Sequence, residues 1–148
     1  LSFVRKNPPK AQVWVDEMGF VNAGIRTGTQ YSYSYLGLGA RRSDGQNYWT
    51  PVYGLGFRKP FKKTFIGVDF LGKRIYKGLT LRNDYAFYHS VYRVIAGYKL
   101  FEHLTVWGGP TLNNIYTHNT INFKIPSWAD TYGDHYKVWP GFVLGVEF

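Results

Sequence analysis

The chain has 148 residues, a length that indicates one domain with a sizeable core, and 20% of its residues are aromatic. It has no cysteine, which excludes a disulfide framework and a thiolate metal site, and no apolar run reaches the length of a spanning helix. The formal net charge of +9 favours anionic partners such as nucleic acid, anionic lipid headgroups or lipopolysaccharide phosphates, unless the basic residues only solvate turns and rims.

Clusters of turn residues divide the chain into segments rich in β-branched and aromatic residues, and helical periodicity is nearly absent. The predicted strands occupy residues 12–26, 31–41, 48–57, 64–76, 85–100, 104–117 and 135–148, with 1–6 as a candidate eighth. The first long segment contains Glu17-Met18-Gly19, which can break it. Strands of this length, joined in sequence by short turns, predict an antiparallel meander.

The predicted strands alternate between two kinds of face. In 64–73, Ile66, Val68 and Phe70 oppose a face that carries Gly67, Asp69 and Lys73. The second face combines Gly, Thr and Asn with isolated charges, which is too poor in solvating residues for the outside of a soluble sheet. Small residues beside a few large ones suit the interior of a narrow barrel.

The final segment, GFVLGVEF, has the same period of two. Phe142, Leu144, Val146 and Phe148 fall on one face, and Gly141, Val143, Gly145 and Glu147 fall on the other. This pattern predicts a strand that ends the chain at an aromatic residue, with its apolar face turned away from the barrel interior.

The terminal FVLGVEF and the hairpin YRVIAGYKLFEHLTVWGGPTLN (92–113) resemble the small bacterial outer-membrane β-barrel proteins. The resemblance implies an all-β, antiparallel, up-and-down transmembrane β-barrel of about eight strands, spanning 1–148 as one domain. It implies a bacterial outer-membrane location, outer-membrane lipid and lipopolysaccharide as surroundings, and contact with the barrel-assembly machinery through Phe142, Leu144, Val146 and Phe148. Turns 26–30, 58–63 and 101–104 would then be periplasmic, and loops 42–47, 77–84 and 118–134 external. The chain opens LSFVRKNPPK without an initiator Met, so we expect either a mature product or the C-terminal part of a longer chain.

Isolated charges on the inward face are the first candidate site. We expect Asp69, Arg93, Lys99 and Glu147, with Arg58 near the rim, to form a charge network inside the barrel. Such a network is either a plug of ion pairs or the selectivity element of a narrow pore, and an eight-stranded barrel favours the plug. The loop INFKIPSWADTYG is the second candidate, because Phe123, Lys124 and Trp128 make it a possible contact surface for a protein partner.

Catalytic motifs are weak. His89 and Ser90 are adjacent and therefore on opposite faces of a strand, so they cannot act as base and nucleophile together. His118 and His135 flank the long loop, but two scattered histidines do not define a metal site, and we predict no metal, no cofactor and no catalytic residue. The leading hypothesis is a non-enzymatic outer-membrane barrel with a structural, adhesion or partner-assembly role. Alternatives are a lipid-modifying barrel enzyme, a narrow pore and a soluble lipocalin-like ligand-binding barrel; scattered basic residues argue against nucleic-acid binding.

Overall fold

A computed structural model describes residues 7–16, 20–43, 45–77, 87–116, 129–131 and 136–148. These residues form nine strands and no helix, so no helix in the described part of the chain can cross a membrane. The strands are β1 (Asn7–Asp16), β2 (Val21–Gly28), β3 (Ser32–Ser43), β4 (Gln46–Phe61), β5 (Thr64–Lys77), β6 (Phe87–Phe101), β7 (Leu104–Tyr116), β8 (Asp130–Thr131) and β9 (Tyr136–Glu147).

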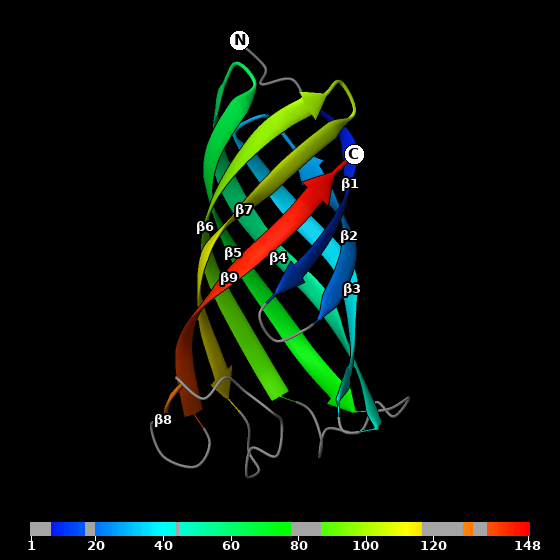
Figure 1. The fold of residues 1–148 in the computed structure, drawn as a ribbon, viewed down its shortest axis with the longest axis vertical. Coiled ribbons are helices and arrows are strands. Elements are labelled where there is room, and N and C mark those ends of the chain that lie inside the picture. Colours follow the sequence, from blue (N-terminus) through cyan, green and yellow to red (C-terminus); the bar gives the residue numbers. More distant parts are fainter. Residues whose placement is uncertain (1–6, 17–19, 44, 78–86, 117–128, 132–135) are drawn as a thin grey trace.

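Eight of these strands close into an antiparallel barrel (Figure 1). They follow one another in the order β1-β2-β3-β4-β5-β6-β7-β9, and β1 pairs with β9 to complete the circle. The closing register runs from Gln12↔Glu147 to Asp16↔Val143. The two-residue β8 pairs with Lys137 and Val138 of β9. The prediction of an all-β, antiparallel barrel of about eight strands is confirmed.

The eighth barrel strand has a different origin from the one expected. The segment predicted as one strand over 12–26 is two strands, β1 and β2, separated around residues 17–19. Glu17-Met18-Gly19 therefore mark a break, as the sequence indicated. The candidate strand at 1–6 lies outside the described residues.

The two ends of the barrel differ in their connections. At the turn end, β4 and β5 are joined at Lys62-Lys63 and β6 and β7 at Glu102-His103, and β1 begins and β9 ends there (Figure 1). Thr64 Oγ1 donates to the carbonyl of Phe61 across the first of these turns, at 2.9 Å. At the opposite end, the loop end, β5 ends at Lys77, β7 ends at Tyr116 and β9 begins at Tyr136. The turns predicted at 58–63 and 101–104 therefore lie at one end, whereas the loop predicted at 42–47 is mostly strand, because β3 continues to Ser43 and β4 begins at Gln46.

Two apolar clusters fill the barrel. The turn-side core consists of Trp14, Tyr33, Tyr35, Val52, Phe65, Leu71, Val91, Ile95, Trp107 and Val143. The loop-side core consists of Phe20, Ile75, Ile115 and Trp139. All of these side chains come from inward positions, so the interior is packed with side chains, as expected for a barrel of eight strands.

Candidate functional site

Asp69 is the centre of a polar network inside the barrel. It lies on β5 between Val68 and Phe70, which are exposed on the outer face, and its own side chain is only 1% exposed. Tyr33 donates its hydroxyl to one carboxylate oxygen at 2.5 Å. Tyr35 donates to the other at 3.1 Å, and Arg93 Nε donates to the same oxygen at 2.7 Å. These donors compensate the cost of burying the carboxylate.

Strand register explains how Asp69 and Arg93 meet. The two residues are directly opposite one another on β5 and β6, so their side chains emerge side by side on the inward face. Space for Tyr33 depends on Gly56 of β4. A Cβ atom at that position would lie 2.2 Å from Asp69 Oδ1 and 2.4 Å from a ring carbon of Tyr33. The glycine therefore makes room for the tyrosine–carboxylate hydrogen bond.

Glu147 is the second acidic centre, next to the seam where β9 meets β1. Arg26 of β2 binds both carboxylate oxygens, through Nε and Nη2, each at 2.8 Å. Arg58 of β4 brings Nη1 to 3.4 Å, and Gln12 of β1 donates its amide to the same carboxylate. Strands β1, β2, β4 and β9 thus share one ionic cluster across the seam.

Arg58 links the two acidic centres. Its Nη2 lies 3.4 Å from the hydroxyl of Tyr35, which itself donates to Asp69. Its guanidinium carbon is 4.0 Å from the ring centroid of Phe65. Arg93 is stacked in the same way, 4.6 Å from the centroid of Trp107. Three arginines and two carboxylates therefore form one network, with aromatic rings covering the guanidinium faces.

A further polar layer lies between the two apolar cores. Lys73 Nζ pairs with Asp16 Oδ2 at 3.1 Å. His89 Nε2 lies 3.0 Å from Asn113 Oδ1, and its ring stacks on Trp139 at 5.6 Å between centroids. A cavity of about 10 Å³ adjoins Lys73, Asp16 and Asn113, which is room for about one water molecule.

The predicted charge network is thus found for four of its five members. Asp69, Arg93, Arg58 and Glu147 are buried and connected. Lys99 was placed wrongly in this network. It lies near the turn end of β6 with an exposed side chain, and its backbone N–H donates to the carbonyl of Lys63.

The sequence reasoning missed several members of the network. Arg26 was assigned to a turn, whereas β2 continues to Gly28. Tyr33 and Tyr35 share the inward face of the alternating stretch SYSY (32–35), which was a readable signal. The Lys73–Asp16 pair joins residues from opposite parts of the barrel wall, and no short-range pattern predicts it.

Candidate catalytic residues do not come together. His89 is buried at 1% exposure, whereas Ser90 is exposed on the outer face, as their adjacency predicted. His103 is exposed in the turn between β6 and β7. His118, His135 and the predicted partner loop with Phe123, Lys124 and Trp128 lie outside the described residues. Among the residues described, no group of three His, Cys, Asp or Glu side chains is close enough to hold a metal ion.

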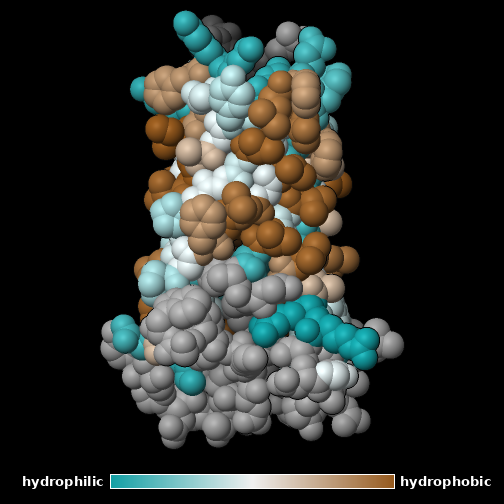
Figure 2. Space-filling model, in the orientation of Figure 1, coloured by the Kyte–Doolittle hydropathy of each residue, from teal (hydrophilic) through white to brown (hydrophobic). Residues whose placement is uncertain are grey.

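The outer face of the barrel is the other candidate site. In the terminal strand, Phe142, Leu144 and Phe148 are 54%, 57% and 54% exposed, while Val146 is half-buried. Their neighbours on the outer wall are also apolar, and Figure 2 shows an apolar, brown band with paler patches on the face of the barrel in view. Comparisons of the chain with protein-family models, with curated proteins and with solved structures each found no match.

Proposed function

We propose that this protein is a transmembrane barrel of a bacterial outer membrane with a plugged interior. In this proposal it has a structural, adhesion or partner-assembly role and catalyses no reaction. Lipid surrounds the apolar band, the barrel-assembly machinery recognises the terminal strand, and any protein partner binds at the loop end. The observation that carries the proposal is the outward apolar band.

All eight barrel strands contribute exposed apolar side chains to the band. Leu36, at 71% exposure, is bordered across β2 and β4 by Ile25 and Tyr53, both more than half exposed. Monomeric soluble proteins rarely expose contiguous apolar patches larger than a few hundred Å². A belt around the whole wall is what a hydrocarbon environment requires.

Aromatic residues border the band at both ends. At the loop end, Tyr88, Tyr116 and Tyr136 are opposite one another across β6, β7 and β9, and all three are exposed. The turn end carries exposed rings as well, from Tyr31, Phe57, Phe61, Tyr98, Phe101 and Phe148. Girdles of aromatic side chains at both water–lipid interfaces are typical of transmembrane barrels.

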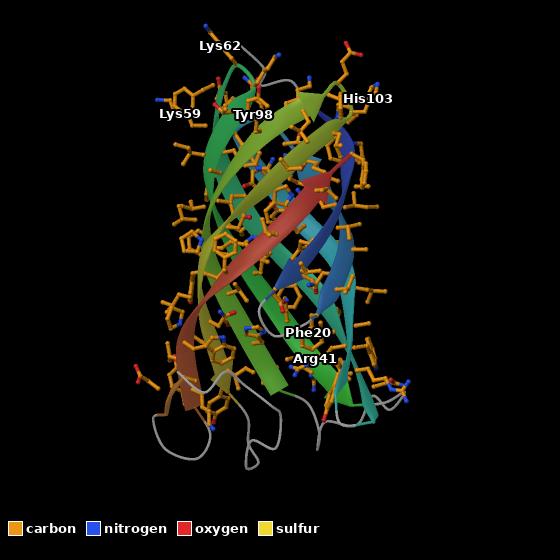
Figure 3. The ribbon with its side chains drawn as sticks, in the orientation of Figure 1. Phe20, Arg41, Lys59, Lys62, Tyr98 and His103 are labelled. Atoms are coloured by element: carbon orange, nitrogen blue, oxygen red, sulfur yellow. The ribbon has the colours of Figure 1, made fainter. Side chains whose placement is uncertain are left out.

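The charged residues named here lie either beyond the apolar band or inside the barrel, as a lipid-facing wall requires. Outward-facing Lys59 and Lys62 lie beyond the band at the turn end (Figure 3), and Arg58, Arg93 and Asp69 are turned inward where they have partners. The packed interior favours a plug over a pore. It also gives a lipocalin-like ligand little room, since the cavity described between the cores is about 10 Å³.

Fractionation with a heat-modifiability gel tests the proposal. We expect the protein in the membrane fraction, with an unboiled band that migrates faster than the boiled one because the barrel resists detergent. A monodisperse protein in the aqueous fraction, with no mobility shift, would contradict it.

A substitution on the band gives a sharper test. Leu36→Lys places a charge at a site that is already exposed. If the site faces lipid near the bilayer centre, the free energy of unfolding falls by about 2–4 kcal/mol. If it faces water, the change stays within about 0.5 kcal/mol. Glu102→Lys, in the exposed turn between β6 and β7, is the control that should be tolerated in both cases.

A further inference from the structure

A groove of about 610 Å³ lies on the outer wall near the loop end of the barrel. We call it the rim groove, and its lining includes Val21, Ala40, Arg41, Arg42, Asn47 and Trp49. Its size falls within the range of roughly 300–1,000 Å³ that small-molecule sites occupy. It lies outside the ionic network of the interior and shares no residue with it.

The short hairpin of β1 and β2 creates the space for this groove. The pairing of β2 with β3 begins at Val21↔Ala40, whereas β3 and β4 continue to Ser43↔Gln46. Figure 1 shows β1 and β2 turning back before the level that the neighbouring strands reach at the loop end. The wall therefore steps down beside the end of β3.

The floor of the groove is apolar. Val21 is 55% exposed and lies opposite Ala40, which in turn lies opposite Trp49 on β4. The Trp49 ring is stacked on Tyr76, with 4.7 Å between centroids and 21° between planes. This stack fixes a flat aromatic surface beside two small aliphatic side chains, a surface suited to a hydrocarbon chain.

The lip of the groove is cationic. Arg41 and Arg42 follow directly after Ala40, and Arg42 lies opposite Asn47 across the strand pair. Arg42 is exposed and faces outward, like Ala40. Arg41 is adjacent to Arg42 and therefore faces the inner side of the strand pair, where its guanidinium is 6.0 Å from the ring centroid of the buried Phe20 (Figure 3). The Arg42 guanidinium next to the Asn47 amide thus provides the donors that match phosphate oxygens.

We propose that the rim groove binds one membrane lipid with an anionic phosphate headgroup. The acyl chain lies on Val21, Ala40 and Trp49, and the phosphate is bound by Arg42 and Asn47. This assignment rests on the proposed transmembrane function, because it needs the groove to lie at headgroup level. Trp49 supports that level, since tryptophan is typical of the aromatic belt at the membrane interface. A free phosphate would leave the apolar floor unused.

Native mass spectrometry of the folded, detergent-solubilised protein tests the proposal. Phosphatidylglycerol and phosphatidylcholine with identical acyl chains are added, and we expect one phosphatidylglycerol to be retained preferentially. Arg42→Gln should weaken its retention about tenfold, since it removes the charge-assisted contact. The matched control, Lys59→Gln, removes one exposed cation at the turn end and should leave it unchanged.

A second variant tests whether binding needs the shape of the groove as well as its charge. Ala40→Trp keeps Arg42 and fills the floor, so it should also reduce retention of phosphatidylglycerol. Equal losses in Arg42→Gln and Lys59→Gln, or full retention in Ala40→Trp, would overturn the site. Arg42 is at an exposed position, so its substitution should leave the barrel folded, which the heat-modifiability gel checks.

The heat-modifiability gel distinguishes the two proposals. A wild-type protein that shifts on boiling and enters vesicles, yet retains both lipids equally, refutes the rim groove and leaves the transmembrane function standing. A wild-type protein that stays in the aqueous fraction without a shift refutes both.

Discussion

The buried arginines combine two kinds of contact. Arg93 donates Nε to Asp69 with the edge of its guanidinium and lays the face of the group over Trp107. Arg58 pairs with Glu147 through Nη1, at 3.4 Å, and lays its guanidinium face over Phe65. Stacking lets a cation stay in a dry interior where its edge alone finds too few acceptors. In this interior, side chains that are both flat and charged fill space that an aliphatic residue would otherwise occupy.

Removing the carboxylate of Asp69 should therefore be costly. Asp69→Ala leaves Arg93 buried without its ionic partner and removes the acceptor of both Tyr33 and Tyr35. We expect the free energy of unfolding to fall by about 3–5 kcal/mol. Denaturant titration of the vesicle-inserted protein, followed by tryptophan fluorescence, measures it. Glu102→Ala in the exposed turn serves as the control. A loss below about 1 kcal/mol for Asp69→Ala would show that the network contributes little to stability.

At the scale of strands, the alternation of apolar and polar residues predicts which face of the wall a side chain lies on, but it does not predict which side chains meet inside the barrel. Val68 and Phe70 fix the outward face of β5 and so place Asp69 inside, which the sequence alone made clear. The same parity put Lys99 on the inward face, but near the barrel mouth an inward position is open to water. The partner of Arg26 is 121 residues away, and only the register of the closed barrel brings them together. The face on which a side chain lies is set by its neighbours along the strand. Its contacts across the lumen depend on the register of strands that are far apart in the sequence.

A substitution in β9, the strand that closes the barrel, tests this dependence on register. Gly145 of β9 lies opposite Trp14 of β1 on one side and Trp107 of β7 on the other. A Cβ atom there would lie 2.4 Å from the Trp107 ring and 2.8 Å from Trp14 Cβ. Gly145→Val should therefore prevent these rings from meeting at the seam and abolish the heat-modifiable band. Ala23→Val, on the outer face of β2, adds similar bulk and should keep it. A normal mobility shift in Gly145→Val would mean that the seam tolerates displaced tryptophans.

The whole molecule has a wall suited to lipid and a lumen filled with side chains. Its eight strands give an interior just wide enough for side chains to fill, and the two apolar cores with their polar layers occupy it. Trp14 and Trp107, both 2% exposed, lie 6.2 Å apart between ring centroids inside the barrel. A hydrated ion therefore meets tilted tryptophan rings and paired charges along the described part of the lumen.

Reconstitution in planar bilayers should consequently give no steady conductance for the wild-type protein. Trp107→Ala removes one of the two tryptophan rings of the turn-side core and the ring nearest the Arg93 guanidinium, so it opens space beside a cation and should produce small, anion-selective current steps. Phe142→Ala, which shortens an exposed side chain on the outer wall, is the control and should stay closed. The heat-modifiability gel must show that each variant is folded before its current is interpreted. Stable channels in the wild-type protein would contradict the plugged interior, because ions would then be crossing a lumen that the Asp69 and Glu147 networks and the tryptophan rings are expected to block.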